Sequence, residues 1–202
     1  HQCQEVSNRI ILTYVERIDV AVIGGGVTGL ASARAIAAQG LSTCVLARHP
    51  RPGLDTSTRN SGVIHAGIYY PAGTLKARLC VEGRHALYEF CTTHHVPHAK
   101  VGKLIVASDD QELASLEGLC AKGTTNGVEG LQMVDASFVS AREPQVHAIA
   151  ALYSPESGIV DAESLVKTLL RTGETAGVIF LPGTKLLDAS ATDGGIELRT
   201  ER

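Results

Sequence analysis

Short apolar runs alternate with segments of helical spacing from residue 18 onwards. The apolar run at 18–23 predicts a first strand, and the Ala-rich segment at 27–39, followed by Gly40, predicts a helix. A second apolar run at 42–47 predicts another strand. Strand, helix and strand within roughly 30 residues make a βαβ unit, so these two strands are expected to be parallel.

Residues 48–73 carry no clear period and are rich in Gly, Pro, Ser and Thr. A connection of this length within a compact domain is usually functional. Helical spacing returns at 74–92, where one side, expected to be buried, carries Leu75, Leu79, Leu87, Phe90 and Cys91. Polar residues elsewhere on this helix are expected to form a solvated face, namely Lys76, Arg78, Glu82 and Arg84.

The rest of the chain repeats this alternation with shorter elements. A capping box at 108–111 opens a helix that ends at Gly127, and Asp161 is the expected cap of a helix at 162–176. A turn is expected at 157–161. The remaining predicted elements are strands at 103–107, 131–134, 150–154 and 178–181, a short helix at 136–143, and a hairpin of 185–191 with 196–200.

This element order predicts an α/β fold: a Rossmann-like nucleotide-binding domain with part of an inserted α+β substrate domain. We expect residues 18–89 and 155–202 to form the nucleotide-binding domain, 90–154 to begin the inserted domain, and 1–17 to be an unpatterned leader. A doubly wound sheet usually needs more strands than follow here, so the chain is also expected to be truncated after the hairpin.

Composition narrows the class of protein. The 202 residues are 44% hydrophobic and 19% charged with a net charge of −3, which is typical of a globular protein without general attraction for nucleic acid. No apolar run approaches the ~20 residues of a transmembrane segment. No secretory or transit signal is recognisable at the beginning, so a cytoplasmic location is expected.

Cysteine and histidine usage predicts neither a disulfide framework nor a metal site. The five cysteines are widely spaced without a C-x-x-C pair, as small buried apolar residues in a reducing compartment are: Cys3, Cys44, Cys80, Cys91 and Cys120. The cluster His94, His95 and His98 has no acidic or cysteine partner at helical spacing, so a polar loop is the expected structure there.

The candidate chemistry begins directly after the first strand, with the pattern Gly24-x-Gly26-x-x-Gly29. Gly24 allows a tight turn, Gly26 lets the backbone approach a pyrophosphate, and Gly29 lets the helix lie close to the strand. The phosphates would meet the free N–H groups at the helix N-terminus. Together with Gly25, Val27 and Thr28, these glycines predict a dinucleotide-binding turn.

The loop at 58–71 identifies the kind of nucleotide enzyme. Its residues 58–67 read Thr-Arg-Asn-Ser-Gly-Val-Ile-His-Ala-Gly, and it is followed by Leu75-Lys76-Ala77-Arg78-Leu79-Cys80. With the glycine turn, and with later segments at 102–107, 143–144 and 154–161, this loop resembles the FAD-dependent oxidoreductases of the D-amino-acid-oxidase superfamily. The resemblance covers residues 16–202 and is strongest to the L-2-hydroxyglutarate dehydrogenase branch.

The resemblance implies FAD as the cofactor and oxidation of a small 2-hydroxy acid by hydride transfer to the flavin, with quinone or oxygen as the electron acceptor. It places His65 near the isoalloxazine ring as a candidate catalytic base, and it places Leu186 near the adenine. A structural role for His65, bonded to backbone, is the alternative. The residues expected to line the flavin and its pyrophosphate are Arg59, Asn60, Ser61 and Gly62.

One position departs from the family pattern. Its members usually end the second strand with an acidic residue that holds the adenosine ribose hydroxyls, whereas this chain has Ala47 followed by Arg48. Losing a charge-assisted hydrogen bond should weaken nucleotide binding by about 1.5–3 kcal/mol. Arg48 also opens the alternative of an NADP 2′-phosphate site. An amine or amino-acid oxidase and a non-catalytic nucleotide-binding fragment are further alternatives.

Overall fold

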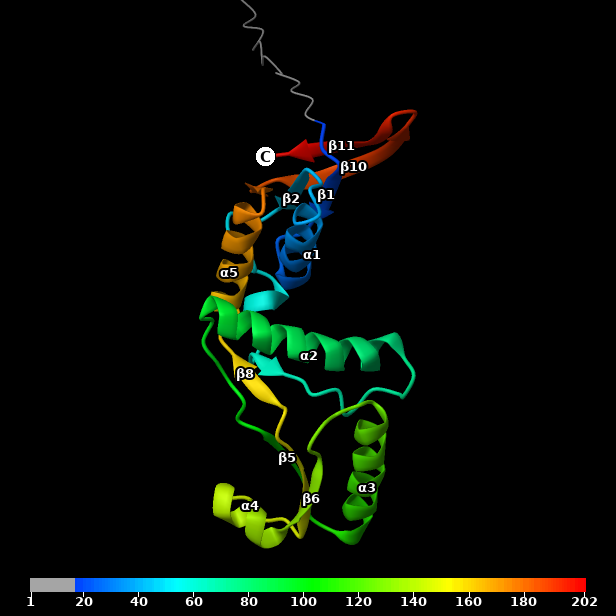
Figure 1. The fold of residues 1–202 in the computed structure, drawn as a ribbon, viewed down its shortest axis with the longest axis vertical. Coiled ribbons are helices and arrows are strands. Elements are labelled where there is room, and N and C mark those ends of the chain that lie inside the picture. The colour runs from blue at the N-terminus through cyan, green and yellow to red at the C-terminus, as the bar shows by residue number, and fades with distance from the viewer. Residues whose placement is uncertain (1–16) are drawn as a thin grey trace, which may run out of the picture.

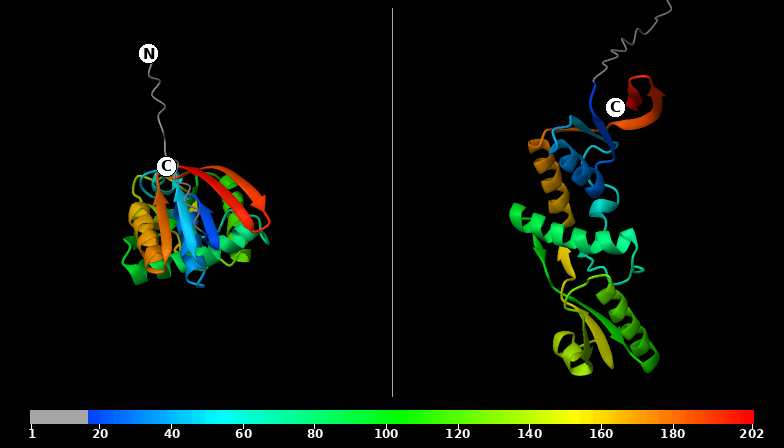
Figure 2. Two further views of the ribbon diagram at one scale, coloured as in Figure 1. Left: turned by 90° about the horizontal axis from the view of Figure 1, so that it is seen from above. Right: turned by 45° about the vertical axis from the view of Figure 1, so that its right-hand side comes forward.

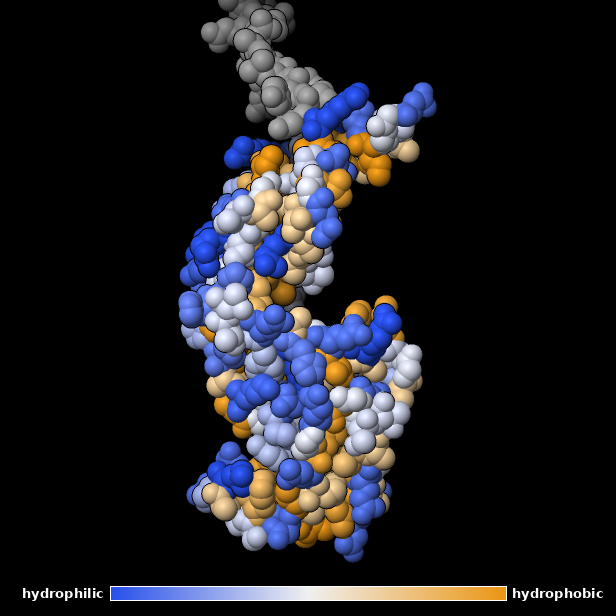
Figure 3. Space-filling view, in the orientation of Figure 1, coloured by the Kyte–Doolittle hydropathy of each residue, from blue (hydrophilic) through white to orange (hydrophobic). Residues whose placement is uncertain are grey.

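The computed structural model describes residues 17–202, and the molecule is elongated (Figure 1). A βαβ part lies at one end, an antiparallel sheet with two helices lies at the other, and the long helix α2 (Leu75–His94) crosses between them. The predicted leader lies almost wholly outside the described residues. Figure 3 shows that the surface is hollowed between the βαβ part and α2.

The βαβ part is built on a parallel sheet, as the sequence predicts. Its strand order is β1 (Val20–Ile23), β2 (Thr43–Ala47) and β9 (Val178–Pro182), with Val22, Val45 and Phe180 in register. The helices α1 (Val27–Ala37) and α5 (Ala162–Thr175) pack on each other and against this sheet (Figure 2). Their shared core includes Leu30, Ala33, Val45, Val166 and Leu169.

A local sequence signal explains where α5 begins. Asp161 caps α5, because its Oδ1 accepts a hydrogen bond from the Ser164 N–H at 2.9 Å. Apolar residues recur on one side of α5, so its buried residues include Leu165, Val166 and Leu169. The carboxylate of Asp161 accepts the backbone N–H of Ser164, and this lowers its pKa. The predicted cap and the helix after it are confirmed.

The last strands form the predicted hairpin. β10 (Lys185–Thr192) pairs antiparallel with β11 (Gly195–Glu201), with a bulge between Leu186 and Asp188. Most of its side chains are exposed, including Leu187 and Ile196. The strand β10 leaves β9 at the carboxyl edge of the parallel sheet, where the Thr184 N–H donates to the Ala47 carbonyl at 2.9 Å.

The middle of the molecule holds a small sheet that the sequence did not predict. β8 (Gly158–Val160) pairs antiparallel with both β3 (Val63–Ile64) and β4 (His98–Ala99). The segment 157–161 was expected to be a turn only. No side chain fits at Gly158, because a Cβ there would collide with the Tyr88 hydroxyl and the Ala99 carbonyl. This close packing joins α2 to the small sheet.

The far end contains the expected start of an α+β unit. Its antiparallel sheet has the order β5 (Lys103–Ala107), β7 (Ala150–Ser154), β6 (Gln132–Asp135), accompanied by α3 (Asp110–Thr125) and α4 (Ala136–Arg142). The cap of α3 is Asp109, which accepts from the Glu112 N–H, while Glu112 accepts from the Ser108 N–H. The predicted helix start is therefore one residue off: Asp109 rather than Ser108 is the cap, and Glu112 rather than Gln111 reaches back, to the N–H of the residue before the cap.

Helix α2 corrects two predictions about its faces. Leu75 and Leu79, expected to be buried, are 62% and 50% exposed. Arg84, expected on the solvated face, is 2% exposed. Helical spacing separates the faces of a helix, but it does not show which face a neighbouring element covers, and here the loops before β6 and β8 bury the arginine.

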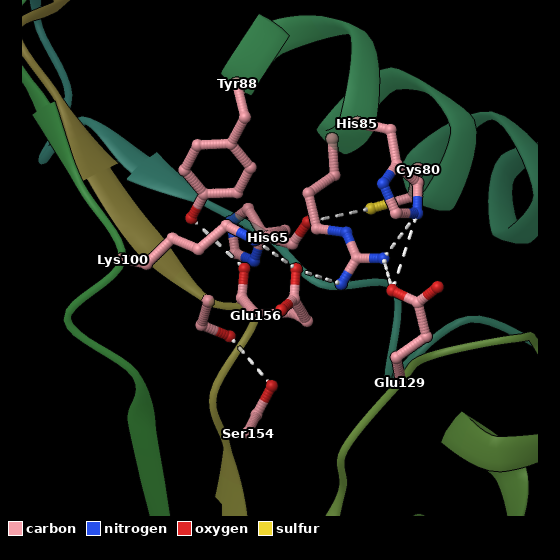
Figure 4. Close-up of polar contacts among 10 residues, drawn as sticks. His65, Cys80, His85, Tyr88, Lys100, Glu129, Ser154 and Glu156 are labelled. Atoms are coloured by element: carbon pink, nitrogen blue, oxygen red, sulfur yellow. Dashed lines mark hydrogen bonds and ion pairs between the residues drawn. The ribbon is translucent and has the colours of Figure 1, made fainter. Parts of the chain in front are cut away.

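The buried guanidinium of Arg84 joins three parts of the chain. Its Nη2 donates to Glu129 Oε2 at 3.0 Å, and its Nη1 lies 3.3 Å from Glu156 Oε2. Glu156 also accepts from Lys100 Nζ at 2.9 Å (Figure 4). Because the arginine side chain is fully buried and the Glu156 side chain is 19% exposed, this contact is screened much less than a surface ion pair.

Two negative findings concern residues 17–202 alone. No helix there is long and apolar enough to cross a membrane. The same part of the chain contains no group of three or more His, Cys, Asp or Glu side chains that could hold a metal ion, and this includes the His94–His98 region.

We predict that Arg84→Ala lowers the free energy of unfolding by about 3 kcal/mol, because it opens a cavity and leaves Glu156 with one cationic partner instead of two. Arg78→Ala is the matched control on the same helix. Arg78 is 66% exposed and lies 3.7 Å from Glu82, so its removal should cost less than about 0.5 kcal/mol. Denaturant unfolding measures both, and equal effects would contradict the assigned role of Arg84.

We also predict an acid dependence of stability through Glu156. The hydrogen bond from Lys100 lowers the pKa of Glu156 below the ordinary 4.5. Desolvation opposes this effect, and the charges of Lys100, Arg84 and His85 add to it. A lowered folded-state pKa stabilises the fold above the unfolded-state pKa, and this stabilisation is lost as the pH falls through the folded-state value. Stability curves of the unmodified chain and Glu156→Gln should therefore differ most above pH 4.5 and converge in more acidic solution. A constant difference would show that charge is not involved.

Candidate functional site

A cavity of about 380 Å³ lies at the carboxyl edge of the parallel sheet. The ends of β1 and β2 and the segment after β9 meet there, because the carboxyl ends of parallel strands lie at one edge. Its walls are formed by the glycine turn, the segment after β2 and the start of β10. The lining residues are Ile23, Gly24, Gly25, Gly26, Leu46, Ala47, Arg48, His49, Arg51, Gly53, Leu54, Asp55, Ser57, Thr184, Lys185 and Leu186.

The glycine turn has the geometry that its spacing predicts. Gly24 has φ +114°, a backbone conformation that side chains disfavour. A Cβ at Gly29 would run into the carbonyl oxygen of Gly24, so only glycine allows α1 to lie this close to the end of β1. Gly26 is the N-cap of α1 and supplies no side-chain cap. The N-cap end of α1 therefore borders the cavity through the backbone of Gly26.

The loop after β2 is fastened to this turn by two hydrogen bonds. The Gly53 N–H donates to the Gly25 carbonyl at 2.9 Å, and the Ser57 Oγ accepts from the Val27 N–H at 3.0 Å. A Cβ on Gly26 would lie 2.9 Å from the same Ser57 Oγ. A hydroxyl that accepts one hydrogen bond still has a proton to donate, so Ser57 can face an anion at the helix N-terminus.

Arg48 and His49 share one carboxylate at the cavity wall. Arg48 Nη2 lies 2.9 Å from Asp55 Oδ1, and His49 Nε2 lies 2.9 Å from the same oxygen. The Arg48 hydrogen bond, followed by that of His49, lowers the pKa of Asp55. The Ala47 side chain, at 4% exposure, offers only a methyl group at the end of β2. Asp55 is the only carboxylate among the residues that line the cavity.

The predicted flavin-lining loop makes contacts within itself and to β8. Asn60 Nδ2 donates to the carbonyls of Thr56 and Ser57, and its Oδ1 accepts from the Gly62 N–H at 2.7 Å. Gly62 has φ +64°, and a Cβ there would run into the Val160 carbonyl. The loop is therefore folded by Asn60 and pressed against β8 at Gly62. Arg59 and Ser61 are exposed, and their assignment to the cofactor stays a prediction.

His65 follows β3 directly and has an exposed side chain. Its carbonyl accepts a hydrogen bond from Cys80 Sγ at 3.6 Å, which ties the segment to α2 (Figure 4). Burial raises the pKa of the Cys80 thiol, so that cysteine stays protonated as a donor. The backbone of His65 is thus fixed while its imidazole remains accessible, and its catalytic role stays a prediction.

The cavity gathers six of the predicted site residues: Gly24, Gly25, Gly26, Ala47, Arg48 and Leu186. The others lie outside its lining, namely Val27, Thr28, Gly29, Arg59, Asn60, Ser61, Gly62 and His65. Sequence reasoning missed Gly53, Asp55 and Ser57. The sequence indicated them only through their position in the aperiodic loop that follows β2 at the same edge of the sheet. No spacing rule selects them individually.

Comparison with known proteins places this geometry in one family. The sequence profile of the DAO family, described as FAD dependent oxidoreductase, matches residues 19–202. Among curated proteins, the mitochondrial L-2-hydroxyglutarate dehydrogenase of Arabidopsis thaliana is 46% identical over 155 residues, which is 77% of this chain and 32% of that protein. The human mitochondrial enzyme is 38% identical over 161 residues, or 79% of this chain and 35% of that protein. The chain spans about a third of the length of these relatives.

Solved structures agree on the fold. FAD-bound L-α-glycerophosphate oxidase from Mycoplasma pneumoniae superposes with a TM-score of 0.86 at 28% identity, covering 92% of this chain and 50% of that one. Glycine oxidase from Geobacillus kaustophilus gives a TM-score of 0.81 at 22% identity, covering 92% of this chain and 52% of that one, and it supports the fold alone.

The expected cytoplasmic location is wrong, because the curated relatives are mitochondrial enzymes. That expectation rested only on finding no targeting segment, and a missing signal does not define a compartment. The expected α/β fold and the superfamily resemblance are confirmed. From the match over residues 19–202 and the superposition on an FAD-bound oxidase, this chain belongs to the DAO family of FAD-dependent oxidoreductases.

Proposed function

We propose that this chain is the nucleotide-binding part of an FAD-dependent enzyme that oxidises a small 2-hydroxy acid, L-2-hydroxyglutarate or a close analogue. The observation that carries the proposal is the cavity at the carboxyl edge of the sheet, where the glycine turn meets the N-terminus of α1. Identities of 38–46% to L-2-hydroxyglutarate dehydrogenases favour this substrate class over amino acids.

The donor set fits the adenosine diphosphate part of FAD. A Cβ on Gly26 would crowd the Ser57 hydroxyl, so glycine leaves the backbone of the turn open, and the N-terminus of α1 carries positive partial charge. Ser57 adds a hydroxyl, and Arg48, Arg51 and Lys185 add cations around the cavity. Leu186, on the strand leaving the sheet edge, supplies an apolar contact suited to the adenine.

FAD, when bound, would supply the redox chemistry, accepting a hydride from the substrate α-carbon. The residue proposed to act on the substrate is His65, whose imidazole takes the proton of the substrate hydroxyl. Histidine is the side chain best suited to exchange a proton near neutral pH. The contact from Cys80 to the His65 carbonyl ties this segment to α2.

The domain division is also a proposal. The sheet β5–β7–β6, with α3 and α4, would begin the substrate domain, as expected for residues 90–154. The small sheet β3–β8–β4 joins the two parts, because β8 pairs both with β3, before the inserted segment, and with β4, inside it. The electron acceptor would be a quinone or oxygen.

We predict that the purified chain, incubated with FAD and desalted, retains absorption near ~450 nm, and that anaerobic L-2-hydroxyglutarate bleaches it. D- and L-amino acids serve as the comparison substrates. Bleaching by amino acids alone would replace the proposed substrate class with that of an amino-acid oxidase. If the chain retains flavin but no substrate bleaches it, the chain binds the nucleotide without catalysing the oxidation.

We predict that His65→Asn slows anaerobic flavin reduction by roughly 10²–10⁴-fold without loss of bound flavin, because asparagine cannot take up the hydroxyl proton. His147→Asn is the matched control, since His147 is also exposed but lies between α4 and β7, at the other end of the molecule from the glycine turn. Stopped-flow absorbance measures the reduction rate, and the flavin content is measured after denaturation. An unchanged rate in His65→Asn would leave His65 with a structural role.

A further inference from the structure

The end of β2 lacks the group that a nucleotide sugar requires. Ribose hydroxyls are donors, and a carboxylate is the acceptor that binds two of them most strongly. Ala47 occupies the end of β2, is 4% exposed, and contributes no acceptor from its side chain. Its carbonyl already accepts from the Thr184 N–H at 2.9 Å. A nucleotide bound in this cavity must therefore find another acceptor for its sugar.

Asp55 is held at the wall of the same cavity. It lies between Gly53 and Ser57, which are each hydrogen-bonded to the glycine turn, at the Gly25 carbonyl and the Val27 N–H. Two anchors within five residues fix the position of Asp55 relative to the place where the phosphates would lie. Its side chain is 57% exposed, so the carboxylate can reach a ligand.

The contacts of Asp55 leave half of its carboxylate available. Arg48 Nη2 and His49 Nε2 both approach Oδ1, each at 2.9 Å. Within residues 17–202, no hydrogen bond or ion pair to Oδ2 is formed. The two neighbours also keep Asp55 ionised, since their hydrogen bonds lower its pKa. An ionised carboxylate with one unengaged oxygen is a strong acceptor for hydroxyl donors.

We propose that Asp55 accepts the adenosine ribose hydroxyls of FAD in place of an acidic residue at position 47. By engaging Arg48, Asp55 also disfavours nucleotides that carry a 2′-phosphate. This inference rests on the proposed placement of FAD in the cavity, and it does not depend on the substrate or on His65.

The discrimination against a 2′-phosphate follows from the negative charge of Asp55. A 2′-phosphate would lie where the ribose hydroxyls lie and would meet the negative Asp55 at short range. Arg48 is poorly placed to offset this repulsion, because its Nη2 is engaged by Asp55 and its Nε by His49 Nε2 at 3.2 Å. The pair Arg48–Asp55 therefore changes Arg48 from a candidate phosphate ligand into a support for the sugar acceptor.

The test compares nucleotide affinities of the 202-residue chain and its variants. FAD binding is followed by quenching of flavin fluorescence, and ADP and adenosine 2′,5′-bisphosphate are measured as competitors. Asp55→Asn should weaken FAD and ADP binding about 10–100-fold and should bind the bisphosphate at least as well as before. Glu163→Gln removes a matched exposed ion pair, with Lys167 on α5, and should change neither affinity.

A rescue variant separates binding from folding. Adding Ala47→Glu to Asp55→Asn returns a carboxylate to the end of β2 and should restore most of the lost affinity for FAD. A thermal melt of each variant reports its folding.

Three results would overturn the proposal. The first is an unmodified chain that binds neither FAD nor ADP, and the second is an Asp55→Asn variant whose FAD affinity is within twofold of the unmodified chain. The third is an equal loss of affinity for ADP and for the bisphosphate, together with a lowered Tm and no rescue by Ala47→Glu. Retained FAD binding without any reaction on 2-hydroxy acids would refute the proposed activity and leave the role of Asp55 intact.

Discussion

The close approach of α1 to the end of β1 is the constraint on which the rest of the structure depends. It exists because Gly29 has no Cβ to meet the Gly24 carbonyl and because Gly24 adopts a positive φ. A side chain at Gly29 would push the helix off the sheet, open the core around Leu30 and Val45, and carry the helix N-terminus away from the cavity. The same two glycines thus set both the packing of α1 and the position of the proposed phosphate site.

A second constraint connects this site to the other end of the chain. The loop after β2 is hydrogen-bonded to the glycine turn at Gly53 and Ser57, and its continuation becomes β3, which pairs with β8. Tyr88 of α2 donates to the Glu156 carbonyl just before β8, and Arg84 lies 3.3 Å from the Glu156 carboxylate. The His65 segment and the segment before β8 are therefore both joined to α2 through polar contacts (Figure 4).

The sequence predicted what is determined locally. Asp161 and the residues after it contain a cap and an amphipathic period, and the glycine turn contains its own spacing, so both were located to within a few residues. The strand β8 was missed because its three residues acquire their structure from partners roughly 60 and 95 residues away. Arg84 was misplaced for a similar reason: a charged residue on a helix indicates a solvated face unless distant carboxylates such as Glu156 cover it. Asp55 was missed because its proposed role depends on two features outside its own position. Position 47 lacks a carboxylate, and the hydrogen bonds of Gly53 and Ser57 to the glycine turn form only in the folded loop.

A crystal structure of the chain grown with FAD tests the central claim most directly. The account predicts that the adenosine diphosphate part occupies the cavity at the carboxyl edge of β1 and β2, with the pyrophosphate at the N-terminus of α1 and a ribose hydroxyl within hydrogen-bond distance of Asp55. Nucleotide density elsewhere on the molecule, or a pyrophosphate that makes no contact with the glycine turn, would contradict it.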